Sequence, residues 1–128
     1  MPKLFRAGVY DSLDELRLEC RGLEPDTEVI VSQITNFTVE ARCFVLDGTP
    51  QTCAVYEGAG DANGAIRFVA ELASTVPLPE TCVLDTGLID GQEWALVEAN
   101  ATWGSGLNGC DAGKAAICIA RACQMEAT

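Results

Sequence analysis

Cysteine is the residue type in this 128-residue chain that could most directly do chemistry, and there are seven of them. No two form a C-x-x-C pair and the chain has no histidine, so the usual ligand spacings of zinc and iron–sulfur sites are missing. A nucleophilic thiolate also normally needs an imidazole or another cation beside it. We therefore expect no metal site, no thiol catalysis and no cofactor. The cysteines are Cys20, Cys43, Cys53, Cys82, Cys110, Cys118 and Cys123.

Two of these cysteines can form a disulfide if the chain between them makes a hairpin. A three-residue loop, Asp47-Gly48-Thr49, would place Cys43 opposite Cys53 at a distance suited to a bridge. The total number of cysteines is odd, so at least one thiol is unpaired or joined to another subunit. Most of the remaining cysteines lie in apolar runs, and we expect them to pack as small hydrophobic side chains.

The triplet Asp85-Thr86-Gly87 resembles the catalytic triplet of dimeric, retroviral-type aspartic proteases. That resemblance implies two carboxylates, one from each chain, which share a proton and activate water. The matching stretch is about seven residues long, and Asp-Thr-Gly is also an ordinary end of a strand. Asp85 is therefore the catalytic residue of an alternative hypothesis only.

The glycine-rich segment 103–116 has the composition of a phosphate-binding loop but not its pattern. In G-x-x-x-x-G-K the first glycine would fall on Asn108, and Ala115 stands where a serine or threonine would hold magnesium. We interpret this segment as a flexible loop without a nucleotide.

The charge balance is strongly acidic, with 19 Asp and Glu residues against 8 Lys and Arg residues. Such a chain repels a phosphate backbone, so nucleic-acid and anionic-membrane partners are disfavoured. No signal peptide or membrane-spanning stretch is recognisable. The localisation stays unknown, with a virion or an extracellular assembly favoured over the cytoplasm.

Short runs rich in β-branched and aromatic residues dominate the chain after residue 28 and predict about seven strands. Asp47-Gly48 and Asn63-Gly64 predict tight hairpin turns, and the proline-rich segment 76–80 predicts a crossover between two sheets. Near the N-terminus, Ser12 with Glu15 forms a capping-box pattern, so segment 11–20 fits a short helix better than a strand. The expected strands lie within 28–35, 37–47, 52–56, 65–72, 81–85 and 93–103.

Along segment 37–45, apolar residues alternate with a largely polar set that includes Glu40 and Arg42. This alternation predicts a strand with one face in the core and one polar face. The resulting fold class is mostly β: a small antiparallel β-sandwich or barrel with one short N-terminal helix as an option. We expect one domain over 1–128, with an N-terminal arm (1–10) and a cysteine-containing C-terminal tail (108–128).

Function follows only by elimination, because no motif carries a specific chemistry. The favoured hypothesis is a non-enzymatic assembly subunit: a phage or virus-like-particle decoration protein (capsid cement) or a tail-associated protein that forms a homo-oligomer or larger assembly. A surface or secreted β-sandwich binding module is the first alternative, and the Asp85 protease is the second. The expected assembly contacts lie in the arm, at Leu4, Phe5, Arg6, Val9 and Tyr10.

Overall fold

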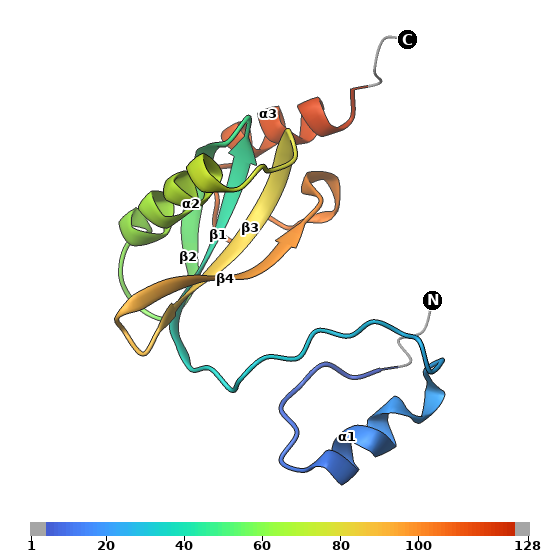
Figure 1. The fold of residues 1–128 in the computed structure, drawn as a ribbon. Coiled ribbons are helices and arrows are strands. Elements are labelled where there is room, and N and C mark those ends of the chain that lie inside the picture. Colours follow the sequence, from blue (N-terminus) through green and yellow to red (C-terminus); the bar gives the residue numbers. More distant parts are fainter. Residues whose placement is uncertain (1–4, 125–128) are drawn as a thin grey trace. The chain divides into compact units, whose positions relative to one another are not determined.

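The computed structural model describes residues 5–124, and its contacts divide the chain into two units, Met1–Thr35 and Asn36–Thr128. Figure 1 labels the helices and strands of both units. The first unit contains helix α1 (Leu13–Glu19) and the 3-10 turn η1 (Cys20–Gly22). In chain order, the second contains β1 (Phe37–Leu46), β2 (Thr49–Glu57), α2 (Asn63–Thr75), β3 (Thr81–Ile89), β4 (Glu93–Asn100), the 3-10 turn η2 (Thr102–Gly104) and α3 (Ala112–Ala122).

The first unit contains the short helix that its capping pattern predicts. The Ser12 hydroxyl accepts a hydrogen bond from the backbone N–H of Glu15, and this bond fixes the start of α1. None of the described residues up to Thr35 is buried. Segment 28–35, expected to be a strand, has no strand partner in the described chain, and Ile30 is fully exposed. The prediction of a strand there is wrong.

The second unit is built on one four-stranded sheet in the order β2-β1-β3-β4, in which all neighbours are antiparallel. The predicted hairpin at Asp47 and Gly48 joins β1 to β2, and both residues adopt the positive φ that a tight two-residue turn requires. A register shift between Phe44 and Val45 then aligns Cys43 with Cys53. A two-residue turn plus a bulge thus produces the alignment expected from a three-residue loop.

Helix α2 occupies the segment that was expected to be a strand after an Asn63-Gly64 hairpin, so both of those predictions are wrong. Ala65, Val69 and Leu72 recur at the spacing of one helical face and pack against the sheet. Strand propensity was outweighed by this helical spacing, which buries a continuous apolar stripe.

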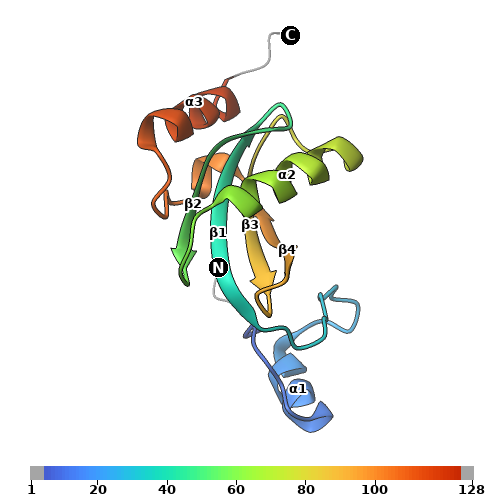
Figure 2. The ribbon, with the colours of Figure 1, turned by 90° about the vertical axis from the view of Figure 1, so that its left-hand side faces the viewer.

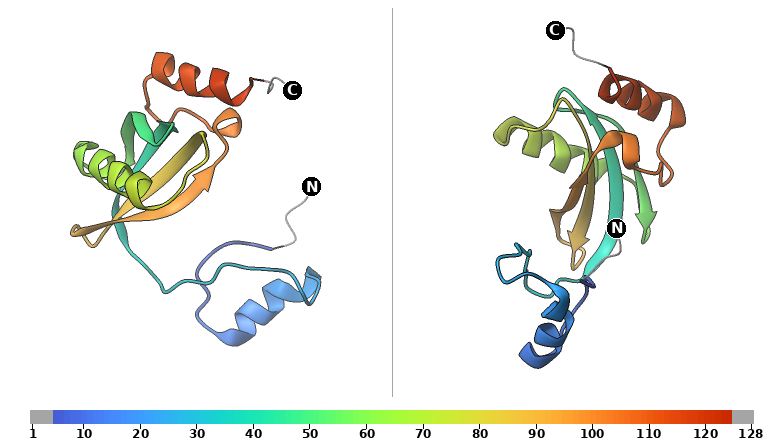
Figure 3. Two further views of the ribbon diagram at one scale, coloured as in Figure 1. Left: turned by 45° about the horizontal axis from the view of Figure 1, so that its top comes forward. Right: turned by 90° about the vertical axis from the view of Figure 1, so that its right-hand side faces the viewer.

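The two faces of the sheet are covered differently. Figures 2 and 3 show α2 and α3 on opposite sides of the sheet. The core under α2 contains the β1 residues Ala41, Cys43 and Val45, which confirms the predicted apolar face of that strand. Under α3, a second cluster includes Phe44 and Cys118. The β-rich class is confirmed, but the structure has one sheet with helices in place of a seven-stranded sandwich or barrel.

Helix α3 lies within the segment expected to be an irregular tail. Asp111 caps it, with its carboxylate accepting a hydrogen bond from the backbone N–H of Lys114 at 2.8 Å. The buried side of the helix contains Ala115 and Cys118, three residues apart. Over residues 5–124, no helix is long and apolar enough to span a membrane. The single-domain organisation stays a prediction.

Candidate functional site

A row of charged side chains crosses the sheet on the face that α3 covers only in part. Arg42 of β1 lies directly opposite Asp85 of β3, and Asp85 lies directly opposite Glu98 of β4. Because successive strand residues point to opposite faces, Arg42 projects away from the α2 core that its neighbours Ala41 and Cys43 enter. Cross-strand partners have Cβ atoms about 5 Å apart, so these three side chains share one small area.

Arg42 and Asp85 form a buried, two-pronged ion pair. The Nε and Nη2 atoms of Arg42 donate to the two carboxylate oxygens of Asp85, each at 2.8 Å. The side chains retain only 12% and 3% of their accessible surface. The hydrogen bond to Asp85 is the main reason that the pKa of Arg42 is raised above its ordinary value. Arg42 is therefore a fixed cation.

The cation is held from a third direction by the loop that follows β4. The Nη1 atom of Arg42 donates to the carbonyl oxygen of Gly106 at 2.8 Å. A guanidinium has five N–H donors, and these contacts with Asp85 and Gly106 use three of them. One N–H on each terminal nitrogen has no partner in the described chain, and two such donors suit a phosphate or carboxylate group.

Tyr56 adds a hydroxyl near the same charges. Burial, followed by the negative charges of Asp85 and Glu40, raises the pKa of Tyr56 to about 12. The phenol is therefore protonated at neutral pH and can donate a hydrogen bond.

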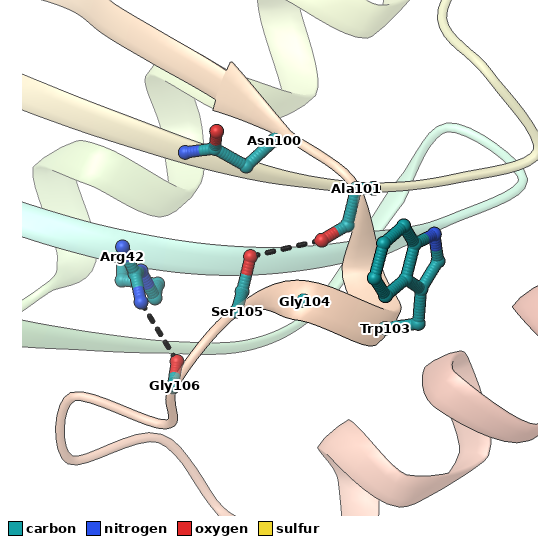
Figure 4. Close-up of a pocket in the computed structure, with 7 residues that line it drawn as sticks. All are labelled: Arg42, Asn100, Ala101, Trp103, Gly104, Ser105 and Gly106. Carbon is teal, nitrogen blue, oxygen red and sulfur yellow. Dashed lines mark hydrogen bonds between the residues drawn. The ribbon is translucent and has the colours of Figure 1, made fainter. Parts of the chain in front are cut away.

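A pocket of about 320 Å³ adjoins this row of charges. Figure 4 shows Arg42 on one side of it and the segment from the end of β4 to Gly106 on the other. Within that segment, the Ser105 hydroxyl donates to the carbonyl oxygen of Ala101 at 2.9 Å, and the indole of Trp103 is 72% exposed. The lining residues are Arg42, Asn100, Ala101, Trp103, Gly104, Ser105 and Gly106.

The thiol of Cys110 secures the backbone at the site. It donates to the carbonyl oxygen of Arg42 at 3.3 Å. The next residue, Asp111, donates its backbone N–H to the Thr52 hydroxyl at 2.9 Å. Burial raises the pKa of the Cys110 thiol, so this cysteine is a neutral structural donor.

The candidate residues from the sequence lie in different places. Asp85 sits within β3, paired with Arg42, and not at the end of a strand. The sulfurs of Cys43 and Cys53 are joined across β1 and β2, on the face opposite Arg42.

The residues expected to make assembly contacts belong to the first unit, except that Leu4 lies outside the described residues. Arg6 and Tyr10 contact each other, through a hydrogen bond from the Tyr10 hydroxyl and through the Arg6 guanidinium over the ring. Phe5 packs near Tyr10, and Val9 is exposed. Their role in an assembly stays a prediction.

A family model for an ATP-grasp domain, the second family of its clade, matches residues 1–118. The match spans most of the chain and both of its units, so the chain belongs to this ATP-grasp family. No curated protein and no solved structure matches it.

The family membership corrects the functional hypotheses from the sequence. An ATP-grasp domain is an enzyme-type domain, so the prediction of a non-enzymatic phage or capsid subunit is wrong. Neither alternative fits better, because the family is neither a binding module of the cell surface nor an aspartic protease. Asp85 has both oxygens engaged by Arg42, whereas the protease mechanism needs two carboxylates sharing a proton.

Sequence reasoning missed Arg42, Glu98 and Asn100 as functional residues. A signal was present: Glu98 and Asn100 are two residues apart at the end of a predicted strand, so they point to the same face. Arg42 lay on the polar face predicted for segment 37–45. What the sequence did not supply was the pairing of β1, β3 and β4 that brings them together.

Proposed function

We propose that this protein is part of an ATP-dependent, ligase-type enzyme and that the polar face around Arg42 binds the phosphates of ATP together with Mg²⁺. One observation carries the proposal: in a chain of the ATP-grasp family, an anchored guanidinium and a facing carboxylate, Glu98, lie on a sheet face beside an open pocket. Fixed positive charge and hard oxygen ligands are what a nucleotide triphosphate and its metal require.

Arg42 is suited to the phosphates because it is already oriented. Its bonds to Asp85 and Gly106 fix the plane of the guanidinium and leave one donor on each terminal nitrogen. Asp85 offsets much of the charge locally, so Arg42 supports binding mainly through directed hydrogen bonds.

The residues present fit Mg²⁺. Magnesium in nucleotide sites is typically held by one or two carboxylates, phosphate oxygens and water. Glu98 supplies a carboxylate, Asn100 an amide oxygen, and each oxygen of Asp85 keeps a lone pair besides the one facing Arg42. No cluster of three His, Cys, Asp or Glu side chains occurs within residues 5–124, as expected where phosphates complete the ligand set. When bound, the ion would neutralise phosphate charge.

Calorimetric titration with ATP, with and without Mg²⁺, tests the proposal. Glu98→Gln removes a charge from an exposed side chain, so it should leave the fold intact and weaken Mg²⁺-dependent ATP binding about tenfold or more. Glu57→Gln is the matched control, since Glu57 is also exposed but ends β2 at the far edge of the sheet. Equal affinities of these two variants, or no ATP binding by the unaltered protein, would refute the proposal.

A further inference from the structure

We infer that the pocket beside Arg42 holds the second substrate of the enzyme, and that this substrate is a carboxylate with a flat apolar group that lies against Trp103. The inference rests on the proposed function, because it takes Arg42 as the phosphate-binding residue. It adds the chemical class of the co-substrate and a specificity-determining residue.

The position of the pocket suits a co-substrate. A ligase must hold its second substrate against the phosphate at which ATP is cleaved, because the reacting atoms have to come within contact distance. The pocket borders Arg42 and Asn100 directly, and its volume of about 320 Å³ is at the small end for ligand sites. A compact organic molecule therefore fits beside the phosphates.

Exposure of the indole points to an apolar part of this substrate. Trp103 is 72% exposed although it is among the largest apolar side chains of the chain, and it lines the pocket from a short turn of backbone. An indole face left open to a pocket offers stacking to a flat ring and an N–H donor at its edge. Arg42 and Asn100 alone would suffice for phosphate, so phosphate binding does not account for Trp103.

The polar lining favours a carboxylate. The remaining N–H on Nη1 of Arg42 and the amide N–H₂ of Asn100, which has no partner among the described residues, are both donors. The Ser105 hydroxyl proton is already used on the carbonyl of Ala101. A group that accepts two hydrogen bonds and carries negative charge therefore matches the pocket, and a neutral amide matches it less well.

The backbone next to Trp103 leaves the pocket open. A Cβ placed on Gly104 would meet no atom within 4 Å, and one on Gly106 would meet only atoms at 3.9 Å. A side chain at either position would therefore reach into free space. The two glycines keep the cavity wide without being needed for the turn.

The test uses Trp103 as its own reporter. The full chain is titrated with phenylacetate and, as the neutral matched probe, phenylacetamide, while tryptophan fluorescence is recorded with and without Mg²⁺ and a non-hydrolysable ATP analogue. Phenylacetate should give a saturable change at least tenfold tighter than that of phenylacetamide. The change should persist in Trp94→Phe and vanish in Trp103→Phe. By calorimetry, Trp103→Ala should bind phenylacetate about five- to tenfold more weakly than the unaltered protein.

The outcomes separate this inference from the proposed function. If the ATP analogue fails to bind but phenylacetate still reports through Trp103, the proposed function falls and the carboxylate pocket stands. If the analogue binds and the two probes behave alike, or if the signal survives in Trp103→Phe, the inference is overturned. It is also overturned if adenosine alone produces the fluorescence change, because the pocket then holds the base.

Discussion

Replacing one member of the Arg42–Asp85 pair should destabilise the protein far more than replacing both. Arg42→Met leaves the Asp85 carboxylate, with 3% of its surface exposed, without its two hydrogen bonds. Breaking a buried ion pair in this way typically costs about 3–5 kcal/mol, whereas apolar replacement of both partners is often neutral. Because one edge of the guanidinium reaches the pocket, we expect the low end, about 3 kcal/mol.

For a domain of roughly 100 residues, that cost lowers Tm by about 12–24 °C. The double variant Arg42→Met/Asp85→Leu should recover most of the loss. Urea unfolding of the unaltered protein and the two variants measures each free energy directly. Arg121→Met is the control, because Arg121 pairs with Asp47 and Glu80 at the surface and its loss should hardly move the midpoint.

Two results would refute this reasoning. A cost below about 1 kcal/mol for Arg42→Met would mean that the Asp85 carboxylate remains hydrated in solution. A double variant no more stable than Arg42→Met would mean that packing of the side chains, and not the uncompensated charge, sets the cost. In both Arg42 variants, ATP binding should be lost, since the proposed phosphate donor is absent.

Three further outcomes are expected. Reducing the Cys43–Cys53 disulfide, with a sequence separation of 10, should lower the free energy of unfolding by about 2–3 kcal/mol, measured in urea with and without dithiothreitol; a Cys43→Ala/Cys53→Ala variant should not respond to the reductant. Because the pKa of Tyr56 is about 12 when folded and about 10 when unfolded, stability should fall between pH 10 and 12, and Tyr56→Phe should flatten that slope in pH-dependent denaturation. Gly64→Ala should destabilise the protein by about 1–3 kcal/mol in thermal unfolding, although alanine favours helices, since its Cβ would overlap the Trp94 indole; a gain in stability would contradict this.

Local chemistry explains which parts of the fold were predictable. Ser12 caps α1 and the pair Asp47-Gly48 turns the β1–β2 hairpin, because in both places neighbouring residues decide the conformation. The same local view failed at Asn63-Gly64, where a turn signal begins a helix whose apolar stripe is satisfied only by packing on the sheet.

The candidate site was hidden for a related reason. Its residues come from three strands, and only the β1–β3–β4 pairing makes neighbours of Arg42, Asp85 and Glu98. The phosphate-loop pattern was correctly judged incomplete at Asn108 and Ala115, but its absence excluded one route to ATP and not ATP itself. A site assembled across a sheet leaves no contiguous motif in the chain.

The anchoring of Arg42 has a consequence for affinity. A free arginine side chain loses up to about 2 kcal/mol of rotamer entropy when it is ordered. Here that loss occurs during folding, because Asp85 and Gly106 hold the guanidinium and the Cys110 thiol holds its backbone carbonyl before any ligand arrives. A ligand that meets Arg42 does not have to immobilise it, and its association can be more favourable by up to the corresponding factor, about thirtyfold in Kd.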